Sequence, residues 1–471
     1  MLLGLALCML VCATAGPASG QASAALPLVW SALVSAAAGA LLAWIGGREQ
    51  ARIGRREALV VVASSWFSAS IFGGLPFVFG AAMTPWDAFF ESSSGFTTTG
   101  ATILVDIEGR LTPPLHLWRM LTHWLGGLGI VVLFVALFPA LGVGGKHLYR
   151  TESAGPQSDG LAPRIRETAF AMWKVYTTLT AVLVLLLLIA GMGGLEALGH
   201  AFSTMGTGGF STRNSSIAAY ESLPIELILT LFMFLAGSNV ALFHEAFRRG
   251  PAVFWHNAEF RAYFSIFAVA SLVIAVDIAQ GPHDSILSGL RFASFQVVAI
   301  MTTTGFATDD FETWPAFSQA LLFSLYFFGG SAGSTAGGMK IIRLLIVLRA
   351  LQGELRRGFR PTLIAPVRVG SQVVLPHVVT ETLAFVVIFL LTVAAGTVAV
   401  ALFDPVDLLT AGSAALTCVS NIGPGFGMVG PTDNFAFLSA PSKVVLSLCM
   451  LLGRLEFFTL LALLVPSFWR R

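Results

Sequence analysis

The stretch FTTTGAT at Phe96–Thr102 has three counterparts farther along the chain. The counterparts are GTGGFST at Gly206–Thr212, TTTGFAT at Thr302–Thr308 and SNIGPGFG at Ser420–Gly427. Because the four stretches share one glycine and recur roughly every hundred residues, they predict four copies of one structural unit. The glycines that take the same structural role in this alignment are Gly100, Gly209, Gly305 and Gly423.

Each shared glycine follows a short apolar run and lies between two longer apolar runs. This order predicts a membrane helix, a half-helix dipping into the bilayer, an extended loop and a second membrane helix. A polar loop at membrane depth is tolerated only where it lines a water-filled path. A single copy would suit a simple Gly/Thr turn between helices, but four regular copies favour one pseudo-fourfold pore lined by backbone carbonyls.

The composition places the whole chain in a membrane. Of the 471 residues, 56% are hydrophobic and only 11% are charged, whereas a soluble protein carries about a quarter charged residues. We therefore expect a polytopic all-α membrane protein without a hidden soluble domain. The cysteines lie in or beside apolar segments, and their spacing matches neither a metal site nor a disulfide framework. We therefore expect them to be small buried hydrophobic residues. They are Cys8, Cys12, Cys418 and Cys449.

The apolar runs predict about ten spans, two leading ones and eight in the repeats. The first run, Met1–Gly16, is short for a span; we expect a short first helix, with cleavage as the alternative. The expected segments are two leading helices and a cytoplasmic linker at 1–57, repeat 1 at 58–141, a linker and repeat 2 at 142–247, a linker and repeat 3 at 248–350, and a linker and repeat 4 at 351–471. The dipping half-helices are expected at Trp86–Gly95, Leu195–Met205, Ile286–Met301 and Val406–Val419. The second membrane helices are expected as continuous spans at Pro114–Leu141, Pro224–Phe247, Pro315–Ala350 and Pro441–Val465, the third with an internal interruption.

The positions of lysine and arginine set the orientation. Most of the 27 basic residues fall on one side of this topology, which marks that side as cytoplasmic. Both termini are then cytoplasmic, and the four loops open outward beside acids that would attract cations. The outer acids are Asp106, Glu108, Asp309, Asp310 and Glu312. The cytoplasmic linkers are short, so nucleotide sensing would have to come from another chain.

The loops have the chemistry that a dehydrated monovalent cation needs. Threonine-rich loops that end in glycine supply backbone carbonyls and hydroxyls, without a charge strong enough to trap the ion. The fourth loop differs from the others through Asn421 and Pro424, so the ring is expected to be chemically unequal. The expected filter residues are Thr97, Thr98, Thr99, Gly100, Gly206, Thr207, Gly208, Gly209, Thr302, Thr303, Thr304, Gly305, Ser420, Asn421, Ile422 and Gly423. Potassium is expected at Thr98, Thr99, Thr207, Gly208, Thr303, Thr304, Asn421 and Ile422.

The segment GGSAGSTAGGMK at Gly329–Lys340 interrupts the last span of the third unit. Its glycines cannot form a stable helix interior. Close packing of membrane helices through small residues is one interpretation, but an unwound, flexible segment under the third loop is favoured, where a gate would act. The expected gate residues are Gly329, Gly330, Gly333, Ser334, Gly337, Gly338 and Lys340, together with Arg454.

Several charged residues lie in apolar segments. Arg454 lies deep in the final span; we expect it to line the pore, with a bridge to another helix as the alternative. Glu456 follows two residues later and points to a different face. Glu91 reads as a local structural acid, and the sequence assigns no role to Arg291.

These motifs resemble the Trk/Ktr/HKT superfamily of potassium transporters, most closely its bacterial TrkH branch. The matching text includes FFESSSGFTTTGAT, HWLGGLGIVVL, LGVGGKHLYRTES, AFSTMGTGGFST, GGSAGSTAGGMKIIR, NIGPGFG and MLLGRLEFFTLLALLVPSFWR. The resemblance implies four helix–pore loop–helix units, with filter glycines at the four aligned positions, a gating loop at Gly329–Gly338 and a pore-facing Arg454. Glycine at all four filter positions implies a preference for potassium over sodium.

The resemblance also implies partners and a location. Similar proteins form homodimers in the bacterial inner membrane and are regulated by a cytoplasmic, ring-forming, nucleotide-binding subunit of the TrkA type. Potassium would then be the transported ion, no cofactor would be covalently bound, and nucleotide would bind only to the partner. The second filter reads MGTGG, where bacterial relatives often have an isoleucine–alanine–isoleucine lead-in.

The leading hypothesis is potassium uptake, either through a gated channel or by a proton- or sodium-coupled carrier. The alternative within the same fold is a sodium-permeable or sodium/proton-coupled cation transporter. An inverted-repeat transporter is disfavoured because every repeat starts on the same face. An intramembrane enzyme is disfavoured because the sequence has no Ser/His/Asp grouping, HExxH motif or paired membrane aspartates.

Overall fold

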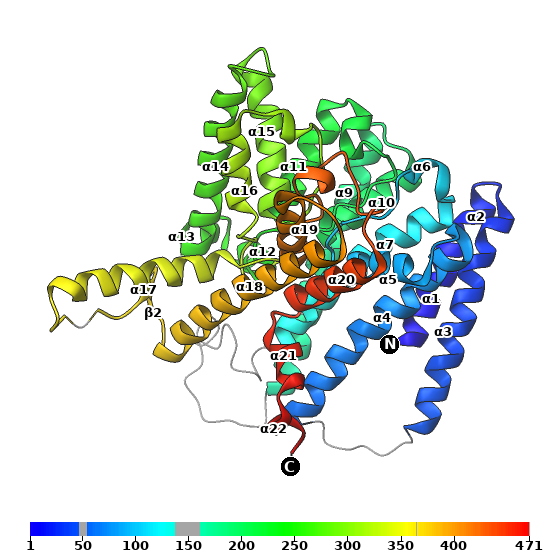
Figure 1. The fold of residues 1–471 in the computed structure, drawn as a ribbon, viewed down its shortest axis with the longest axis horizontal. Helices are drawn as coiled ribbons and strands as arrows, with labels where there is room; N and C mark the ends of the chain where they lie inside the picture. The colour runs from blue at the N-terminus through cyan, green and yellow to red at the C-terminus, as the bar shows by residue number, and fades with distance from the viewer. Residues whose placement is uncertain (47–53, 137–160, 364, 471) are drawn as a thin grey trace.

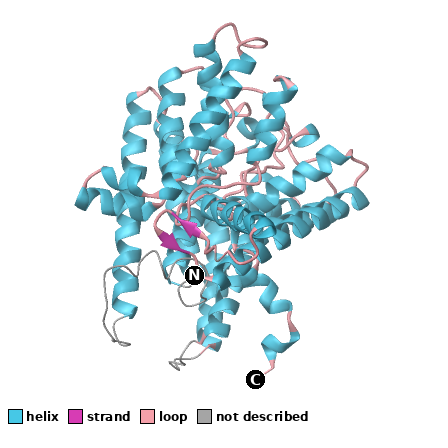
Figure 2. Ribbon diagram, turned by 90° about the vertical axis from the view of Figure 1, so that its left-hand side faces the viewer, coloured by secondary structure: helices cyan, strands magenta, loops and turns pink. Residues whose placement is uncertain are grey.

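The computed structural model describes residues 1–46, 54–136, 161–363 and 365–470. These residues are mostly helical, which confirms the all-α fold class (Figures 1 and 2). Within the described ranges the strands are two short antiparallel ones, β1 (Arg368–Val369) and β2 (Gln372–Val373), which form a hairpin (Figure 2). The ends of several expected segments, including the linker at 142–168 and the end of Pro114–Leu141, fall partly outside these ranges.

The helices follow the expected order of two leading helices and four units. The leading part contains α1 (Leu2–Ala13), α2 (Ala15–Ala18), the 3-10 turn η1 (Ala22–Ala25) and α3 (Leu26–Ile45). The first unit contains α4 (Arg55–Ala81), α5 (Pro85–Phe96), α6 (Ile107–Arg110) and α7 (Pro113–Ala136). The second contains α9 (Leu161–Ile189), α10 (Gly194–Gly206), η3 (Ser216–Tyr220), α11 (Leu223–Ala236) and α12 (Val240–Arg249).

After the short helix α13 (Ala252–His256), the remaining two units repeat this order. The third contains α14 (Ala258–Ile278), α15 (Ile286–Met301), η4 (Phe311–Thr313), α16 (Ala316–Leu325) and α17 (Ile341–Phe359). The fourth contains α18 (Pro376–Phe403), α19 (Leu408–Ser420), η5 (Gly427–Val429), α20 (Ala440–Arg454) and α21 (Phe458–Leu464), before the final turn α22 (Pro466–Trp469).

The half-helices α5, α10, α15 and α19 are too short to cross a bilayer. They have 12, 13, 16 and 13 residues, which at about 1.5 Å per residue fall short of a hydrocarbon core of about 30 Å. Three of them start at a side-chain cap. Thr84 accepts a hydrogen bond from the amide of Asp87, Ser285 from Ser288, and Asp407 from Leu409.

The long helices cover the half-helices and face outward. Each half-helix packs against the first membrane helix of its own unit, in the pairs α4–α5, α9–α10, α14–α15 and α18–α19. Three of the half-helices also meet the second helix of a neighbouring unit: α7 packs on α10, α11 on α15, and α20 on α5. The third and fourth units meet where α17 packs on α18 and where the ring of Phe311 lies 5.2 Å from that of Phe426. Each unit therefore contacts the next, and the contact of α20 with α5 joins the fourth unit back to the first.

The span count depends on how the bent helices are treated. By length and composition, five of the described helices could cross a membrane, and seven if each bent pair counts as one span. The bent pairs are α11 with α12, at 93°, and α20 with α21, at 116°. The expectation that Pro224–Phe247 and Pro441–Val465 are continuous helices is therefore wrong.

Local contacts explain both bends. The carbonyl of Gly237, after α11, accepts a hydrogen bond from the amide of Ser331, and Asn239 caps the new helix through the amide of Ala241. After α20, Glu456 and Phe457 both adopt positive φ angles, of 54° and 59°, which a right-handed helix cannot contain. The chain thus changes direction within the last expected span of both the second and the fourth unit.

Candidate functional site

The four loops share one backbone shape. Two residues before each shared glycine lies a residue with a φ of 54–57°, although none of these residues is a glycine. The shared glycines themselves have φ between 76° and 108°. A left-handed non-glycine residue costs on the order of 1–3 kcal/mol, so its recurrence at one position in four loops indicates a conformation imposed by the surroundings. The non-glycine residues are Thr98, Thr207, Thr303 and Asn421.

Each loop also turns back onto its half-helix in the same way. The amide of the residue before the shared glycine bonds to the carbonyl five residues earlier, which is the pattern of a Schellman ending. These bonds run from Thr99 to Ser94 at 2.8 Å, Gly208 to Ser203 at 2.9 Å, Thr304 to Ala299 at 2.8 Å, and Ile422 to Thr417 at 3.0 Å. The negative ends of four helix dipoles therefore meet at the loops, where they favour a cation.

The carbonyls of those same four residues lie against glycines of neighbouring loops. A Cβ atom on Gly100 would overlap the carbonyl oxygen of Gly208, and a Cβ on Gly209 would overlap that of Thr304. A Cβ on Gly305 would overlap the carbonyl of Ile422. A Cβ on Gly423 would lie 2.8 Å from the carbonyl of Thr99, which returns the contacts to the first loop. The glycines and carbonyls thus form a closed ring that leaves no room for side chains.

Most of the loop hydroxyls bond within the protein. Thr97 donates to the carbonyl of Ser93 at 2.6 Å and lies 2.8 Å from the hydroxyl of Thr99. Thr302 makes the same two contacts in the third loop, to the carbonyl of Val298 and the hydroxyl of Thr304. These hydroxyls brace the loops, which leaves the backbone carbonyls as the oxygens best placed for an ion.

The fourth loop differs from the other three at Asn421, where they have a threonine. The amide group of Asn421 donates to the hydroxyl of Thr99 at 3.0 Å and to the carbonyl of Met450 at 2.9 Å. Its side chain therefore ties the fourth loop to the first loop and to α20. Thr98, at the equivalent position of the first loop, has a buried hydroxyl without a hydrogen-bond partner in the described part of the chain.

The glycine-rich segment Gly329–Lys340 lies outside any helix and packs against these loops. The amide of Gly337 donates to the hydroxyl of Thr303 at 2.7 Å. A Cβ on Gly337 would lie 2.6 Å from the carbonyl of Ser420, the last residue of the fourth half-helix. Gly333 and Gly338 have positive φ angles of 75° and 63°. The segment thus contacts the third and fourth loops with backbone that only glycine allows to approach so closely.

Hydrogen bonds from the second unit hold the same segment. The hydroxyl of Thr335 donates to the carbonyls of Met205 at 3.0 Å and Ala236 at 3.2 Å. The amide of Val240 donates to the carbonyl of Gly333 at 3.2 Å. Gly329 and Gly330 begin the segment, Ser334 bonds within it to Ser331, and Lys340 bonds within it to the carbonyl of Ala336.

Arg454 joins the segment to the first unit. Its guanidinium donates to the carbonyl of Thr335 at 2.7 Å and to the carbonyl of Gly126, on α7, at 3.1 Å. The side chain is buried and bridges two elements, which agrees with the alternative of a structural bridge. The expectation that Arg454 lines a pore stays a prediction. Glu456 pairs instead with Arg343 on α17.

A buried carboxylate that the sequence did not single out holds both ends of the segment. Glu259, in the first turn of α14, accepts hydrogen bonds through one oxygen from the amides of Ala332 at 2.7 Å and Ile342 at 3.1 Å. Its side chain is buried. The one available signal was an acid at the start of an apolar span, which is unusual in a membrane.

Two other ion pairs, one buried and one half-buried, brace the units. Glu91 pairs with Arg119 at 2.6 Å, and Arg119 also donates to the carbonyl of Ser211 in the second loop at 3.0 Å, which confirms the structural interpretation of Glu91. Arg291, which the sequence left without a role, makes two bonds of 2.6 Å to Glu226.

The outer acids mainly hold loops together. Glu108 pairs with Arg213 at 3.2 Å, and Asp309 with His283 at 2.9 Å. Glu312 accepts a hydrogen bond from the amide of Gly427 at 2.6 Å and so joins the third and fourth loops. The amide of Gly109, which donates to Asp106, lowers the pKa of that carboxyl below its usual value. In the described ranges no three histidine, cysteine or acidic residues cluster as metal ligands, so the ring carbonyls are the best candidate ligands for an ion.

Comparisons with known proteins agree with this architecture. Residues 29–470 match a family model described as TrkH, cation transport protein. The Trk system potassium uptake protein TrkH of Salmonella typhimurium is 39% identical over 453 residues, which cover 93% of this chain and 91% of that protein. The TrkG protein of the Escherichia coli K12 Trk system is 31% identical over 429 residues, 88% of this chain and 86% of that protein. The crystal structure of the potassium transporter TrkH from Vibrio parahaemolyticus superposes with a TM-score of 0.91 at 34% identity and covers all of this chain and 97% of that one.

Proposed function

The chain belongs to the TrkH family of cation transport proteins, and from this premise we propose that it takes up potassium through the carbonyl ring. Membership of the family confirms the resemblance carried by the motifs, and the apolar helices make the chain a multi-pass membrane protein. The relatives are named as potassium uptake proteins, which supports potassium as the cargo here.

The observation that carries the proposal is the closed ring of contacts between glycines and carbonyls. Carbonyl oxygens can replace the hydration shell of a monovalent cation, because they offer several ligands without a net charge. In this proposal the ions lie at the carbonyls of Thr99, Gly208, Thr304 and Ile422, with further sites at the preceding residues Thr98, Thr207, Thr303 and Asn421. The braced hydroxyls and the four helix ends hold this ring in shape.

The glycine-rich segment Gly329–Lys340 is the proposed gate. It is held in place by all four units: directly by the second, third and fourth, and through Arg454 by the first. Segments that block a path must move, and glycine keeps the alternative backbone arrangements close in energy. We propose that the described arrangement is the closed one, with the segment across the path on the cytoplasmic side of the ring.

The location and partners are part of the same proposal. The basic linkers support a bacterial inner membrane protein with both termini in the cytoplasm. The name of the Trk system supports a complex with further components. We propose a homodimer regulated by a cytoplasmic, ring-forming, nucleotide-binding subunit of the TrkA type, which would act on the gate through α17.

A complementation experiment tests the proposal. The chain is expressed in a bacterium that lacks potassium uptake, and growth is measured on low potassium with low or high sodium. Growth rescue in both media supports selective potassium uptake, whereas rescue that collapses in high sodium supports the sodium-permeable alternative. Absence of rescue by a chain that is present in the membrane at normal level would contradict the proposed function.

A further inference from the structure

We propose that a cavity between α14, α17 and the β1–β2 hairpin binds a phosphate-bearing anion, the headgroup of an anionic phospholipid in the inner leaflet. The cavity has a volume of about 720 Å³ and is open to the surface. It lies apart from the ring, at the start of α14 and along α17. Its lining includes Ala258, Arg261, Arg349, Gln352, Arg356 and Arg368.

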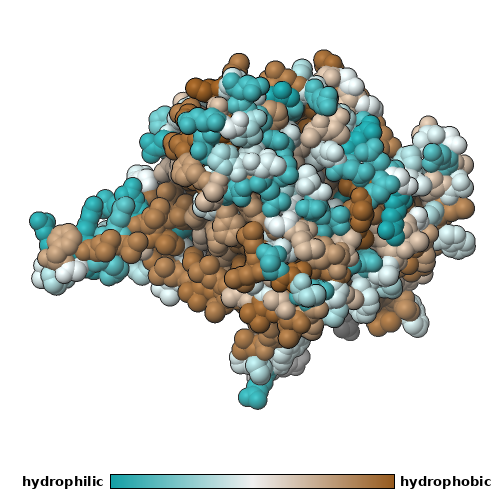
Figure 3. Space-filling view, turned by 45° about the horizontal axis from the view of Figure 1, so that its top comes forward, coloured by the Kyte–Doolittle hydropathy of each residue, from teal (hydrophilic) through white to brown (hydrophobic). Residues whose placement is uncertain are grey.

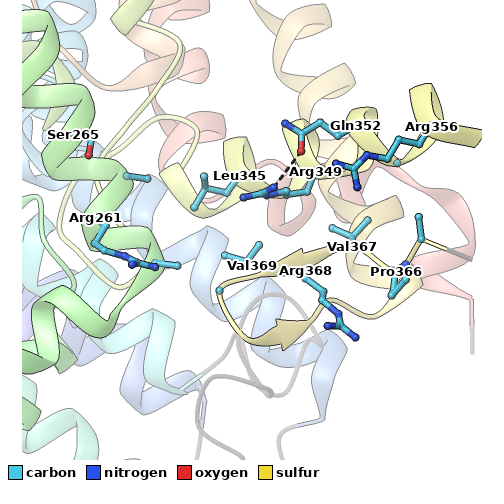
Figure 4. Close-up of a pocket in the computed structure, with 15 residues that line it drawn as sticks. Arg261, Ser265, Leu345, Arg349, Gln352, Arg356, Pro366, Val367, Arg368 and Val369 are labelled. Carbon is cyan, nitrogen blue, oxygen red and sulfur yellow. Dashed lines mark hydrogen bonds between the residues drawn. The ribbon is translucent and has the colours of Figure 1, made fainter.

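The charge of this lining is one-sided. It contains four arginines and no acidic residue. Figure 4 shows Arg261 on α14 and Arg349 and Arg356 on α17 placed one after another along the cavity, while Arg368 points to the other side of the hairpin. Arginine presents planar, paired donors that match phosphate oxygens.

The nearby acids are already engaged elsewhere. Glu259 on α14 accepts the amides of the glycine-rich segment, and Glu354 on α17 pairs with Arg357 at 2.5 Å. Arg349 donates to the neutral amide oxygen of Gln352 at 3.2 Å. Among the described residues, Arg261, Arg349 and Arg356 therefore have no ion-pair partner that would neutralise them.

The position of the cavity matches the height of lipid headgroups. It lies at the cytoplasmic start of the membrane span α14, and α17 projects sideways from the foot of α14 (Figure 1). Exposed aromatic residues, Trp255 and Phe264, pack against each other one helical turn from Arg261, with ring centroids 5.2 Å apart. Aromatic side chains gather at the interface between the membrane and water.

Helix α17 has the pattern of an interfacial helix. Its exposed apolar residues lie on one stripe, and the arginines of the cavity lie on a face about 100° away, as expected for 3.6 residues per turn. Figure 3 shows apolar and hydrophilic residues on separate sides of this projecting arm. A headgroup in the cavity would leave its acyl chains free to lie along the apolar stripe. That stripe contains Leu348, Leu351, Leu355 and Phe359.

Occupancy of the cavity would also act on the proposed gate, a consequence that rests on the proposed function. Ala258 lines the cavity next to Glu259, which holds Ala332 and Ile342, and α17 begins directly after the glycine-rich segment. A headgroup held between Arg261 on α14 and an arginine of α17 would fix α17 against α14. The headgroup would therefore favour the closed arrangement.

Lipid binding to the purified full-length chain is measured first, by native mass spectrometry with phosphatidylglycerol and with phosphatidylcholine. The parent protein should prefer phosphatidylglycerol. The triple variant R261Q/R349Q/R356Q should lose about tenfold or more of that preference, because each arginine near a headgroup contributes about 1 kcal/mol. The matched triple variant K174Q/R248Q/R470Q removes the same charge away from the cavity on the cytoplasmic side and should retain the preference. The lysine triple R261K/R349K/R356K should retain part of it, and size-exclusion chromatography checks that all variants are folded.

A competition experiment with inorganic phosphate shows whether the cavity binds a lipid headgroup or a soluble phosphate compound. If a soluble phosphate compound is the ligand, phosphate binds to the parent, is lost in R261Q/R349Q/R356Q, and displaces the lipid. If the lipid is the ligand, millimolar phosphate leaves the bound phosphatidylglycerol in place. Equal loss of lipid in both glutamine triples would overturn the site in favour of general surface charge. Unchanged binding of lipid and phosphate in R261Q/R349Q/R356Q would also overturn it, and would point to an acidic protein partner.

Potassium flux in liposomes is the separate functional measurement. At fixed phosphatidylglycerol content, R261Q/R349Q/R356Q should conduct faster than the parent and than K174Q/R248Q/R470Q. Lost lipid binding with unchanged flux would overturn the link to the gate but not the site. No flux in the parent would count against the proposed function, whatever the binding result.

Discussion

Thr303 and Gly337 are joined by a hydrogen bond of 2.7 Å, in which the amide of Gly337 donates to the threonine hydroxyl. The bond links the third loop of the ring to the glycine-rich segment between α16 and α17. Both groups are buried, so neither can turn to water if the bond is lost. The proposed filter and the proposed gate are thus connected by a direct contact.

Thr303→Val should raise the basal potassium flux by several-fold. Valine keeps the shape of threonine but leaves the amide of Gly337 without an acceptor, which costs about 1–3 kcal/mol in the closed arrangement. Flux in liposomes measures the change. Thr98→Val is the matched control, because this hydroxyl lies at the equivalent position of the first loop and has no partner in the described residues. Equal effects of the two variants would contradict a specific role for the bond.

Gly100→Ser should lower the ratio of potassium to sodium flux by about fivefold or more, the equivalent of about 1 kcal/mol. A Cβ at this position would overlap the carbonyl of Gly208, so the ring must distort. Gly194→Ser is the control, because a Cβ there meets no atom within 4 Å. A flux ratio equal to that of the parent would remove Gly100 from the filter.

Arg454→Ala should raise basal flux, because the side chain bridges Thr335 to Gly126. If the segment is the gate, as proposed, the side chain would also place a positive charge beside the path. Arg454→Lys separates the two effects, since lysine keeps the charge but lacks the forked donors that reach both carbonyls. If the bridge dominates, the lysine variant conducts like the alanine variant. If the charge dominates, it stays close to the parent. Poor expression and inactivity of both variants would mean that Arg454 serves folding alone.

Glu259→Ala should also raise basal flux by several-fold. Its carboxylate oxygen accepts from Ala332 and Ile342, on either side of the glycine-rich turn, and its loss frees two buried amides at once. Glu259→Gln keeps an oxygen acceptor and should fall between the parent and the alanine variant. Glu245→Ala is the control, since that acid pairs with Arg249 at the surface. Wild-type flux in Glu259→Ala would show that the clamp does not limit opening.

Deletion of Gly333–Gly337 should give a protein that conducts faster and no longer responds to nucleotide on the regulatory subunit. The deletion removes the contacts of the segment with Thr303, Ser420 and Val240. Flux in liposomes with and without that subunit measures both effects.

Replacing the same glycines with alanine should shift the balance of gating by favouring helix, at roughly 1 kcal/mol per exposed position. An intact rate and an intact nucleotide response after the deletion would leave the segment as a packing surface only.

The sequence by itself determined the repeat, the loops and the interruption, because each depends on local chemistry. A glycine is needed where φ is positive and a carbonyl approaches closely, as at Gly100 and Gly305, and such positions repeat visibly in the chain. Apolar runs that are too short to span predict half-helices, and the glycines of Gly329–Lys340 exclude a helix there.

Only the tertiary structure decided which of these parts touch. The contact of Gly423 with the carbonyl of Thr99, which closes the ring, joins residues more than three hundred positions apart, and no local pattern encodes it. The bends after Gly237 and Arg454, the pair of Arg291 with Glu226 and the clamp by Glu259 depend in the same way on partners from other segments. A buried charge or amide must find a partner somewhere in the membrane, so the sequence predicts that one exists; packing of the four units decides which one it is.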